Sequence, residues 1–429
     1  MTSHQKKTGW SVKRLNELGF VGRGKSKHRP RNDPSLYGGP FPFIQTGEVK
    51  EADLYISHFA HTYNDKGLAQ SKLWDPGTLL ITIAANIAET AILKIKACFP
   101  DSIVGFIADP AKSDVRFVKY SIDAMKLRMQ SVSRGTTQDN LSLDKLLSFD
   151  FLVPDAHVQS KIAAVLSAYD DLIENNIRRI RILENILRAL YNEWFVKFRF
   201  PGNENIKTVE SEVGPIPEGW VVKMLGDIAQ EMRRSVSPNE IEPETPYIGL
   251  EHMPRMSIAL SEWGFAKQVR STKLCFKKGE ILFGKIRPYF HKVGVAPVDG
   301  VCSSDAIVIS SKSPEYFAIV LACISSDEFI AHATQTSQGT KMPRANWDVL
   351  TKYPVAIPPN SLVSRFDELA REMVDQIQNM VLRNRNLRCT RDLLLPKLIS
   401  GELDVENLDI AIPESAPNAE TATLAPTAV

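Results

Sequence analysis

Apolar residues recur at helical spacing in two long stretches of the chain. They fall alternately three and four residues apart, and the first series is Ile162, Leu166, Tyr169, Ile173, Asn176, Ile180, Leu183, Leu187, Leu190 and Trp194. The second series is Phe366, Ala370, Met373, Ile377, Met380, Asn384, Leu387, Arg391, Leu394 and Leu398. Two seams of this kind on one chain predict two long helices that pack together as a coiled coil.

Each seam contains one asparagine, Asn176 in the first and Asn384 in the second. A polar residue inside a seam costs stability and fixes the register of the pair. The alternative is two amphipathic helices, each packed on its own domain. Length favours the coiled coil, because ~40 residues at ~1.5 Å each span ~60 Å, which is longer than such domains are wide.

A mixed pattern precedes each helix. The runs GTLLITI, AILKI, GEILFG and DAIVIS are short and rich in β-branched residues, and Gly/Pro turns separate them. This pattern predicts two mixed α/β globules. The boundary phrases VPDAHVQ and IPPNSLVS offer Asp155 and either Asn360 or Ser361 as helix N-caps.

These patterns divide the chain into six segments. We expect a first globular domain at 1–153, a long helix at 154–198, a linker at 199–217, a second globular domain at 218–357, a second long helix at 358–401 and a disordered tail at 402–429. The linker is polar and rich in Pro and Gly, and the tail is Ala/Pro/Thr-rich without periodicity.

The two halves repeat each other. The phrases SRGTTQDNLSLDKL (133–146) and SQGTKMPRANWDVL (337–350) share residues at matched places 204 positions apart. The same offset relates Pro42 to Pro246, Cys98 to Cys302, Asp101 to Asp305, Ile103 to Ile307 and Pro154 to Pro358. GWSVKRL (9–15) and GWVVKML (219–225) match at an offset of 210. The chain is therefore an internal duplication, with too long a period for a solenoid.

Composition is that of a soluble protein of more than one domain. The chain has 429 residues, of which 43% are apolar and 24% charged. Its five cysteines are scattered without CxxC spacing, which predicts reduced thiols. The longest apolar runs fall short of the ~20 residues of a membrane span, and the N-terminus has no signal-type stretch. We therefore expect a cytoplasmic protein.

Charge is unevenly distributed. Residues 1–31 hold nine Lys/Arg and one Glu, whereas six acidic residues and no basic one follow from Glu402 onward. The basic block either contacts an anionic partner such as nucleic acid or is a solvated arm.

No catalytic or metal motif is complete. Gly22 and Gly24 lack the third glycine of a dinucleotide loop, and Gly284-Lys285 lacks the hydroxyl residue of a phosphate loop. The eight histidines show no HxH or HxxxH spacing. We therefore predict a chain without catalytic residues, metal site or cofactor of its own.

Binding chemistry remains. The irregular stretch GRGKSKHRPRNDPSLYGG (22–39) places cations on alternate positions, at Arg23, Lys25, Lys27, Arg29 and Arg31. The second half has only Arg233 and Arg234 there, but FGKIRPYFHKVG interleaves cations and aromatics at Lys285, Arg287, Tyr289, His291 and Lys292. Such residues contact phosphates and base edges, although the second stretch could equally be a surface strand with a basic face.

Taken together, the chain resembles the specificity subunits of type I restriction-modification systems. The two GW-VK-L openings, the Gly-Thr phrases before a proline and a long helix, and the ending LLLPKLISGELDV (393–405) carry the resemblance, which covers residues 9–405.

The resemblance implies a mixed α/β fold with two target-recognition domains, separated by two antiparallel helices with pseudo-twofold symmetry. Each domain reads one half of a bipartite, asymmetric site in double-stranded DNA. The helices dock two methyltransferase subunits, motor-nuclease subunits then join, and S-adenosylmethionine belongs to the methyltransferase. The alternatives are a restriction-methylation enzyme with its catalytic domain in this chain, and a coiled-coil adaptor that does not bind DNA.

Overall fold

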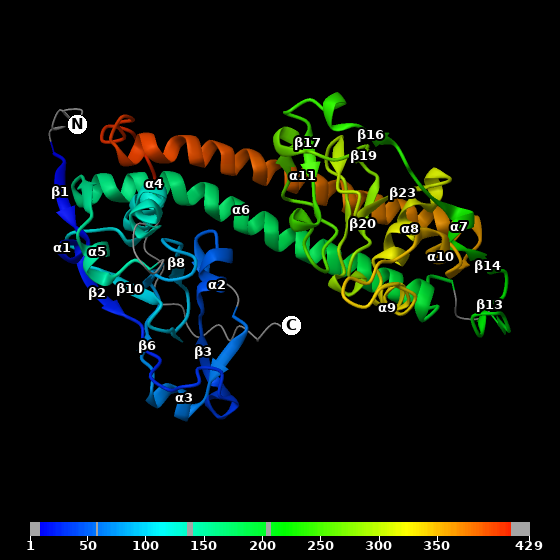
Figure 1. Ribbon diagram of the computed structural model, residues 1–429, viewed down its shortest axis with the longest axis horizontal. Helices are drawn as coiled ribbons and strands as arrows, with labels where there is room; N and C mark the ends of the chain where they lie inside the picture. Colours follow the sequence, from blue (N-terminus) through cyan, green and yellow to red (C-terminus); the bar gives the residue numbers. More distant parts are fainter. Residues whose placement is uncertain (1–8, 57–58, 135–139, 203–206, 413–429) are drawn as a thin grey trace. The chain divides into compact units, whose positions relative to one another are not determined.

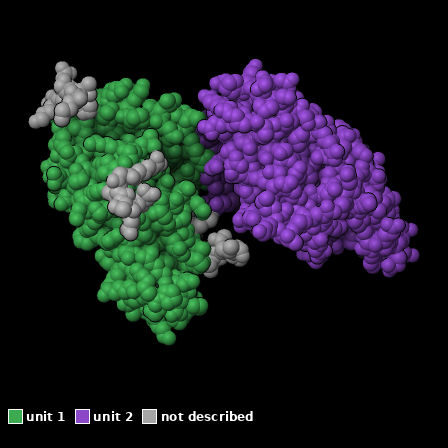
Figure 2. All heavy atoms as spheres, in the orientation of Figure 1, with its two compact units in different colours: residues 1–174, 387–429 green, residues 175–386 purple. Residues whose placement is uncertain are grey.

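The computed structural model describes residues 9–56, 59–134, 140–202 and 207–412. The chain forms two compact units (Figure 2): unit 1 comprises residues 1–174 and 387–429, and unit 2 comprises residues 175–386. Two long helices, α6 (Ala156–Tyr191) and α11 (Asn360–Ile399), contribute to both units (Figure 1).

Unit 1 is built on two sheets and a separate strand pair. The first sheet has the order β2 (Gly19–Arg23), β10 (Ile103–Ala108), β7 (Leu79–Thr82), β8 (Thr90–Leu93), β4 (Tyr55–Ile56). The second has the order β5 (His61–Tyr63), β3 (Tyr37–Phe43), β9 (Ala97–Cys98), β6 (Leu73–Trp74), and the pair is β1 (Ser11–Arg14) with β11 (Asp150–Val153). The shorter helices are α1 (Leu15–Leu18), α2 (Thr46–Glu51), α3 (Asp65–Ala69), α4 (Val115–Arg134) and α5 (Leu143–Leu147).

Unit 2 repeats this plan, except that the fifth strand belongs to its second sheet and not to its first. Its sheets have the orders β15 (Ala229–Glu231), β23 (Ala306–Ser311), β20 (Ile281–Gly284), β21 (Val293–Val295), and β16 (Ser235–Val236), β19 (Lys273–Phe276), β22 (Gly300–Cys302), β17 (Pro246–Ile248), β18 (Gly264–Phe265). The separate pair is β14 (Val221–Met224) with β24 (Pro354–Ile357). Helices α7 (Leu225–Ile228), α8 (Phe317–Ile324), α9 (Asp327–Gln335) and α10 (Trp347–Leu350) complete it, and a small hairpin of β12 (Thr208–Val209) and β13 (Ile216–Pro217) lies in the predicted linker.

The duplication is shifted by one residue in the central strand. Val104 on β10 faces the core that contains residues of the long helices, and in unit 2 Ile307 on β23 does so. The sequence match paired Ile103 with Ile307 instead, but Ile103 faces the opposite core. Because strand side chains alternate between faces, a shift of one residue exchanges them. The side-chain faces therefore correct this part of the repeat alignment.

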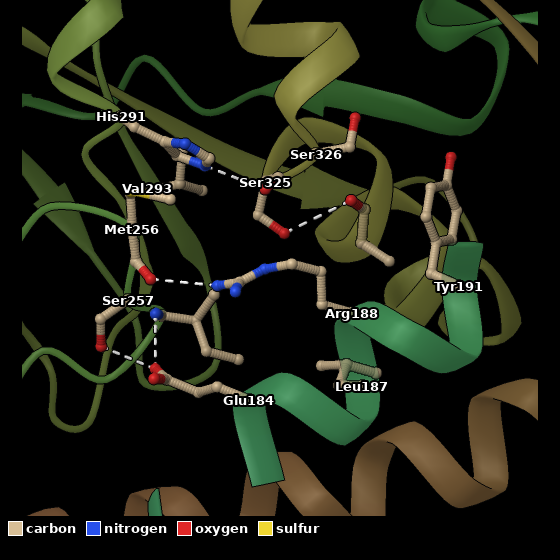
Figure 3. Close-up of a pocket in the computed structure, with 12 residues that line it drawn as sticks. Glu184, Leu187, Arg188, Tyr191, Met256, Ser257, His291, Val293, Ser325 and Ser326 are labelled. Atoms are coloured by element: carbon tan, nitrogen blue, oxygen red, sulfur yellow. Dashed lines mark hydrogen bonds between the residues drawn. The ribbon is translucent and has the colours of Figure 1, made fainter. Parts of the chain in front are cut away.

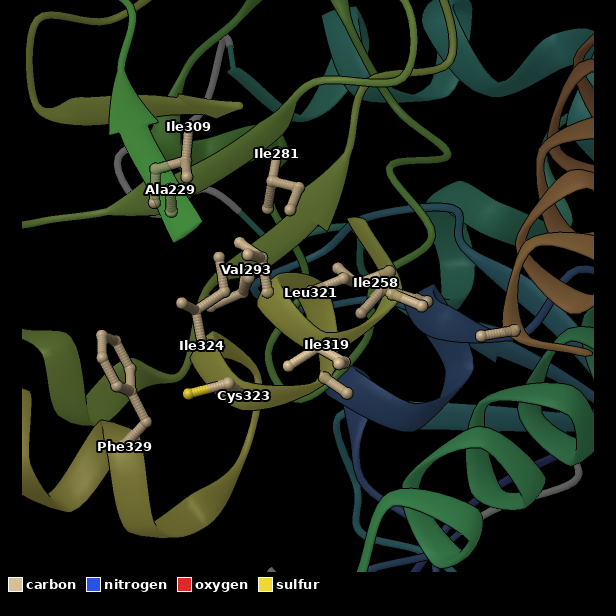
Figure 4. Packing of buried hydrophobic residues seen from close by; sticks show 14 of the residues in the cluster. Ala229, Ile258, Ile281, Val293, Ile309, Ile319, Leu321, Cys323, Ile324 and Phe329 are labelled. Atoms are coloured by element: carbon tan, nitrogen blue, oxygen red, sulfur yellow. The ribbon is translucent and has the colours of Figure 1, made fainter. Parts of the chain in front are cut away.

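The larger core of unit 2 surrounds α8. Seven of its eight residues, Ala318 to Ile324, are buried. They pack with Val293 and Ile309 of the sheet and with Phe329 of α9 (Figure 4). A helix that is apolar on all sides is stable in such a core. No single helix of the described chain is long and apolar enough to cross a membrane, and one bent pair, Pro314–Ile324 with Asp327–Gln335, passes by length and composition only.

The long helices begin where the boundary phrases predict. Asp155 caps α6, since its Oδ1 accepts a hydrogen bond from Val158 N at 3.0 Å. At α11 the cap is different from the prediction: the carbonyl of Pro359 accepts from the backbone N–H groups of Leu362 and Val363, and Asn360 is already helical. A turn of π-helix at Asn192–Val196 ends the first helix.

The seam residues lie inside the helix pair, where each is buried or half-buried. In unit 1, Ile162 and Leu398 belong to the same core. In unit 2, Trp194 packs on Phe366 with ring centroids 5.9 Å apart. Residue numbers thus rise along α6 as they fall along α11, so the helices are antiparallel, and the mixed α/β fold with two long helices is confirmed.

The segment after α11 folds back onto unit 1. Val405 is buried, and Lys161 Nζ donates to the carbonyls of Glu406 and Leu408 at 2.7 and 2.9 Å. The tail expected from Glu402 is therefore ordered as far as residue 412, because an apolar side chain and a buried lysine hold it. Residues 413–429 lie outside the described part.

Candidate nucleic-acid interface

The first basic segment of unit 1 is extended and packed on one face. Gly24 and Ser26 are buried, whereas Arg23, Lys25 and Lys27 are exposed. Backbone hydrogen bonds from Gly24 N to Ile103 O (2.9 Å) and from Lys25 N to Phe99 O (3.0 Å) hold it. A Cβ at Gly24 would lie 2.2 Å from Pro100 O, so the close approach requires glycine. The alternation seen in the sequence thus directs three cations outward.

The remaining arginines of this segment surround one carboxylate, Asp101. Arg31 donates to Asp101 Oδ1, and the Arg29 guanidinium lies 3.7 Å from Asp101 Oδ2. Arg23 Nε donates to the backbone carbonyl of Asp101 at 2.7 Å. Within the described chain, Lys25 Nζ and Lys27 Nζ make no hydrogen bond or ion pair. The five predicted cations of unit 1 therefore fall into a paired group and an unpaired group.

One further cation of unit 1 lies beside this segment. Lys72 Nζ is 3.7 Å from the ring centroid of Trp74, and the exposed ring of Phe20 is within cation–π distance at 5.2 Å. The neighbouring Ser71 Oγ donates to Lys25 O at 2.6 Å. Sequence reasoning missed Lys72 because it is about fifty positions from the basic segment, and no local pattern marks it.

In unit 2 the predicted residues from Lys285 to Lys292 lie in and beside a tight turn, Pro288–Phe290. Both flanking residues adopt left-handed backbone conformations, Arg287 with φ 49° and His291 with φ 50°. Such conformations are unfavourable for non-glycine residues and are kept only where surrounding contacts impose them. Here Arg287 N donates to Pro343 O at 2.8 Å, while Tyr289 remains half exposed. The turn therefore holds a cation and an aromatic side chain in a defined place.

Two of the predicted residues point inward instead. His291 is 8% exposed, and its Nε2 is 2.9 Å from Ser325 O. Burial lowers the pKa of His291 and also, together with the charge of Arg255, that of Lys292. Lys292 Nζ donates to Leu250 O. The polar atoms of these two side chains therefore bond within unit 2 and stabilise the turn.

Arg233 and Arg234 are paired with acids. Arg233 Nε donates to Glu231, which raises the pKa of the arginine, and Arg234 donates to Glu280. They lie in the short segment between β15 and β16, outside the turn. The structure therefore does not gather all the predicted cations of unit 2 into one cluster.

Three cations near the turn were missed. The guanidinium of Arg255 is 4.3 Å from the ring centroid of Phe290, and Arg344 lies 3.6 Å from Asp305 Oδ1. Arg344 forms a backbone bridge with Ile286, which brings exposed Lys341 beside the turn as well. Lys341 and Arg344 belong to the repeated phrase SQGTKMPRA, so the duplication itself was a signal that could have found them.

A pocket behind the turn links it to α6 (Figure 3). Glu184 Oε1 accepts from Ser257 Oγ at 2.6 Å and from Ile258 N at 2.8 Å. Arg188 donates to Met256 O at 3.1 Å, and Met256 N donates to His291 O at 2.9 Å. Burial raises the pKa of Glu184, against the opposing effect of these hydrogen bonds. The helix thus supports the segment on which the turn rests.

The helix pair contains a different polar contact in each unit. In unit 1, Asp170 is fully buried and accepts from Tyr120 Oη and Arg391. Burial favours a lower pKa for Arg391, but the charges and hydrogen bonds of Asp170 and Asp392 together outweigh it and raise the pKa. In unit 2, Asn176 Nδ2 donates to Asn384 Oδ1 at 2.8 Å, and both side chains are buried.

Among the described residues, no three His, Cys, Asp or Glu side chains are grouped so that they could hold a metal ion.

The sequence model of the type I restriction modification DNA specificity domain matches residues 7–185 and 217–379, which is most of the chain. The chain belongs to this specificity family. It is a DNA specificity subunit of a type I restriction-modification system, the subunit of the complex that is not catalytic.

Relatives of this specificity subunit match nearly its whole length. It is 28% identical to the type I restriction enzyme MjaIX specificity subunit of Methanocaldococcus jannaschii, over 93% of this chain and 94% of the relative. It is 23% identical to the EcoDI specificity subunit of Escherichia coli, over 92% and 89%. The crystal structure of the S subunit from M. genitalium has the same fold, with a TM-score of 0.58 at 14% identity, covering 92% of this chain and 97% of that one.

Family membership decides between the three functions that the sequence left open. A specificity subunit is neither the methylating enzyme nor an adaptor without DNA.

Proposed function

We propose that each unit of this specificity subunit reads one half of a bipartite, asymmetric site in double-stranded DNA. The observation that carries the proposal is the duplication: two units, each built on two sheets that share four strands in the same order, each present a group of cations. In unit 1 these cations are exposed: Arg23, Lys25, Lys27, Arg29 and Arg31. In unit 2 they are the half-buried Lys285 and Arg287 and the exposed Arg255, Lys341 and Arg344, with the exposed ring of Tyr289 beside them. The groups differ in residues and backbone geometry, which supports the reading of different base sequences.

Exposed cations beside aromatic rings suit duplex DNA. Lysines neutralise phosphates, and arginines pair with guanine O6 and N7 in the major groove. Of the other predicted residues, we assign supporting roles to His291 and Lys292, because their polar atoms bond within unit 2. Arg233 and Arg234, each paired with a glutamate, are assigned phosphate contacts at most.

We further propose that α6 and α11 dock two methyltransferase subunits, to which motor-nuclease subunits are added. Large apolar side chains that are exposed on the helices support this role: Leu172, Ile182 and Ile186 on α6, and Leu369 and Leu393 on α11. Exposed apolar residues on a helix pair are typical of a surface that a partner covers. S-adenosylmethionine then belongs to the methyltransferase partner.

Methylation mapping tests the proposal. The chain is expressed with its neighbouring methyltransferase in cells that lack other modification enzymes, and modified adenines and cytosines are located across the genome. We expect one motif of two short specified parts separated by unspecified base pairs. Substituting Lys285, Arg287 and Arg344 together by Ala should relax one part and leave the other intact. A single uninterrupted motif would contradict the assignment of one unit to each part.

The helix pair is proposed to set the separation of the two parts. One extra heptad in each helix keeps every seam residue facing its partner and adds up to ~10 Å, or about three base pairs. The duplex twists over that length, so the change in spacer is expected to be about one to three base pairs. Inserting two or three residues instead should place polar residues in the seam and abolish assembly. An active heptad variant that methylates only the original spacing would refute this role.

A further inference from the structure

The cations of unit 1 differ in how firmly they are held. Arg29 donates through one terminal nitrogen to the carbonyls of Ser26 (2.7 Å) and His28 (2.8 Å), and its other terminal nitrogen faces Asp101. Arg31 donates to Asp101, while Tyr37 Oη donates to the backbone carbonyl of Arg31 at 2.8 Å. The ammonium groups of Lys25 and Lys27 have no hydrogen bond or ion pair with any described residue, although the backbone of both lysines is hydrogen-bonded.

Fold stability does not explain the carboxylate at the centre. The side chain of Asp101 is 38% exposed, and those of Arg29 and Arg31 are 55% and 45% exposed. Ion pairs this open to solvent contribute little to folding, because water and salt screen them. A carboxylate among cations also weakens attraction to phosphates, so it opposes general DNA affinity.

Orientation is what the carboxylate does provide. One terminal nitrogen of Arg31 donates to Asp101. The Nε and the second terminal nitrogen of Arg31 have no hydrogen-bond partner among the described residues. A guanidinium held on one side presents its remaining N–H groups in a fixed plane. Recognition by a side chain that is already oriented loses less conformational entropy on binding.

We propose that Asp101 is a specificity-determining positioning residue, which orients Arg31 to bind a guanine of one half-site, while Lys25 and Lys27 contact phosphates. This rests on the proposed DNA interface of unit 1. Arg29, tied to two carbonyls, completes the frame around Asp101. Specificity is thus gained at the expense of general affinity.

The duplication supplies a matched control. Asp305 precedes the central strand of unit 2 as Asp101 does in unit 1, and it faces Arg344 at 3.6 Å with similar exposure. The same Asp→Asn change can therefore be made in either unit. Asp305→Asn should leave the half-site read by unit 1 unchanged.

The experiment uses the full-length chain assembled with its methyltransferase. Affinity is measured for a duplex with the mapped site, for duplexes with each half-site base pair changed in turn, and for an unrelated duplex. Asp101→Asn should reduce discrimination at one G·C pair by about tenfold to a hundredfold, and raise affinity for the unrelated duplex by roughly twofold or more at low salt. Arg31→Ala should lose the same discrimination, and adding Asp101→Asn to it should change discrimination no further.

Lys25→Ala and Lys27→Ala provide the contrast. Each should weaken all duplexes alike and lower the salt dependence by about one phosphate contact. Thermal unfolding checks that every variant folds, and Asp101→Glu, which keeps the charge, should retain most of the discrimination.

The possible failures are distinguishable. If Asp101→Asn weakens the specific and the unrelated duplex equally, or leaves discrimination intact while the lysine variants act as expected, Asp101 is not a positioning residue. If neither the lysine variants nor Arg31→Ala alters DNA binding, the proposed interface of unit 1 is itself wrong.

Discussion

Unit 1 and unit 2 share the order of four strands in each sheet but present cations in different ways. Unit 1 uses an extended segment, whose alternate residues point outward and whose arginines surround Asp101. Unit 2 uses a turn with left-handed residues at both ends, supported from behind by Glu184 and Arg188 of α6. The comparison teaches that the scaffold tolerates different loops, because the sheets and long helices hold each core without them.

The helix pair differs between the units as well. In unit 1 the two helices are joined by a buried ion pair between Asp170 and Arg391. In unit 2 they are joined by a hydrogen bond between two neutral amides, those of Asn176 and Asn384. An unpaired charge in a protein interior costs more than an unpaired amide. Substitutions in the two units should therefore have unequal effects.

The largest effect is expected from Arg391→Leu. It leaves the Asp170 carboxylate buried without its counter-charge, and breaking a buried pair in this way costs about 3–5 kcal/mol of stability. Denaturant unfolding measures the loss, and hydrogen exchange should locate it in unit 1. Arg383→Leu, at an exposed position of the same helix, is the control. Equal effects of the two substitutions would show that the pair does not stabilise unit 1.

Asn384→Leu should be the milder counterpart in unit 2. The Asn176 amide loses its buried partner, at a cost of about 1–3 kcal/mol, and hydrogen exchange should locate the loss in unit 2. The double variant Asn176→Leu/Asn384→Leu should recover most of the stability, because no amide is left unpaired. A double variant that is less stable than Asn384→Leu would contradict the view that the unpaired Asn176 amide causes the loss of stability.

For recognition, Arg287→Ala and Arg31→Ala should act separately. Each should cost about 1–3 kcal/mol of discrimination at one position of its own half-site. Competition binding against duplexes altered in one half-site at a time measures both. Loss of discrimination in both half-sites with Arg287→Ala would break the assignment of one unit to each half-site.

The smallest effect should come from Glu184→Gln, and its direction with pH is the test. The raised pKa of Glu184 means that the folded chain binds this proton more tightly than the unfolded chain does. Wild-type stability should then fall as pH rises through the ordinary glutamate range, until the raised pKa is passed. The glutamine variant lacks this loss and should gain relative to wild type over the same range. Denaturant unfolding at several pH values measures the difference in stability between wild type and the glutamine variant. A difference that is constant with pH would contradict a raised pKa of Glu184.

Much of the fold was readable from local patterns. Three- and four-residue spacing marked both helices, since the period of a helix is set by its own backbone. The repeated phrases revealed the duplication. In the basic segment, Arg23, Lys25 and Lys27 alternate with Gly24 and Ser26. This pattern also indicated which side chains of that segment are exposed.

Only the tertiary structure decided how distant residues pair. The sequence marked His291 and Lys292 as candidates, but contacts with Ser325 and Leu250 turn them inward. Asp101 lies about seventy positions from Arg31, and Asn384 about two hundred from Asn176, so no local period connects them. Likewise, the face on which Ile103 lies followed from strand pairing and not from its match to Ile307. A backbone period acts over a few residues, whereas burial and charge pairing depend on which segments the completed fold brings into contact.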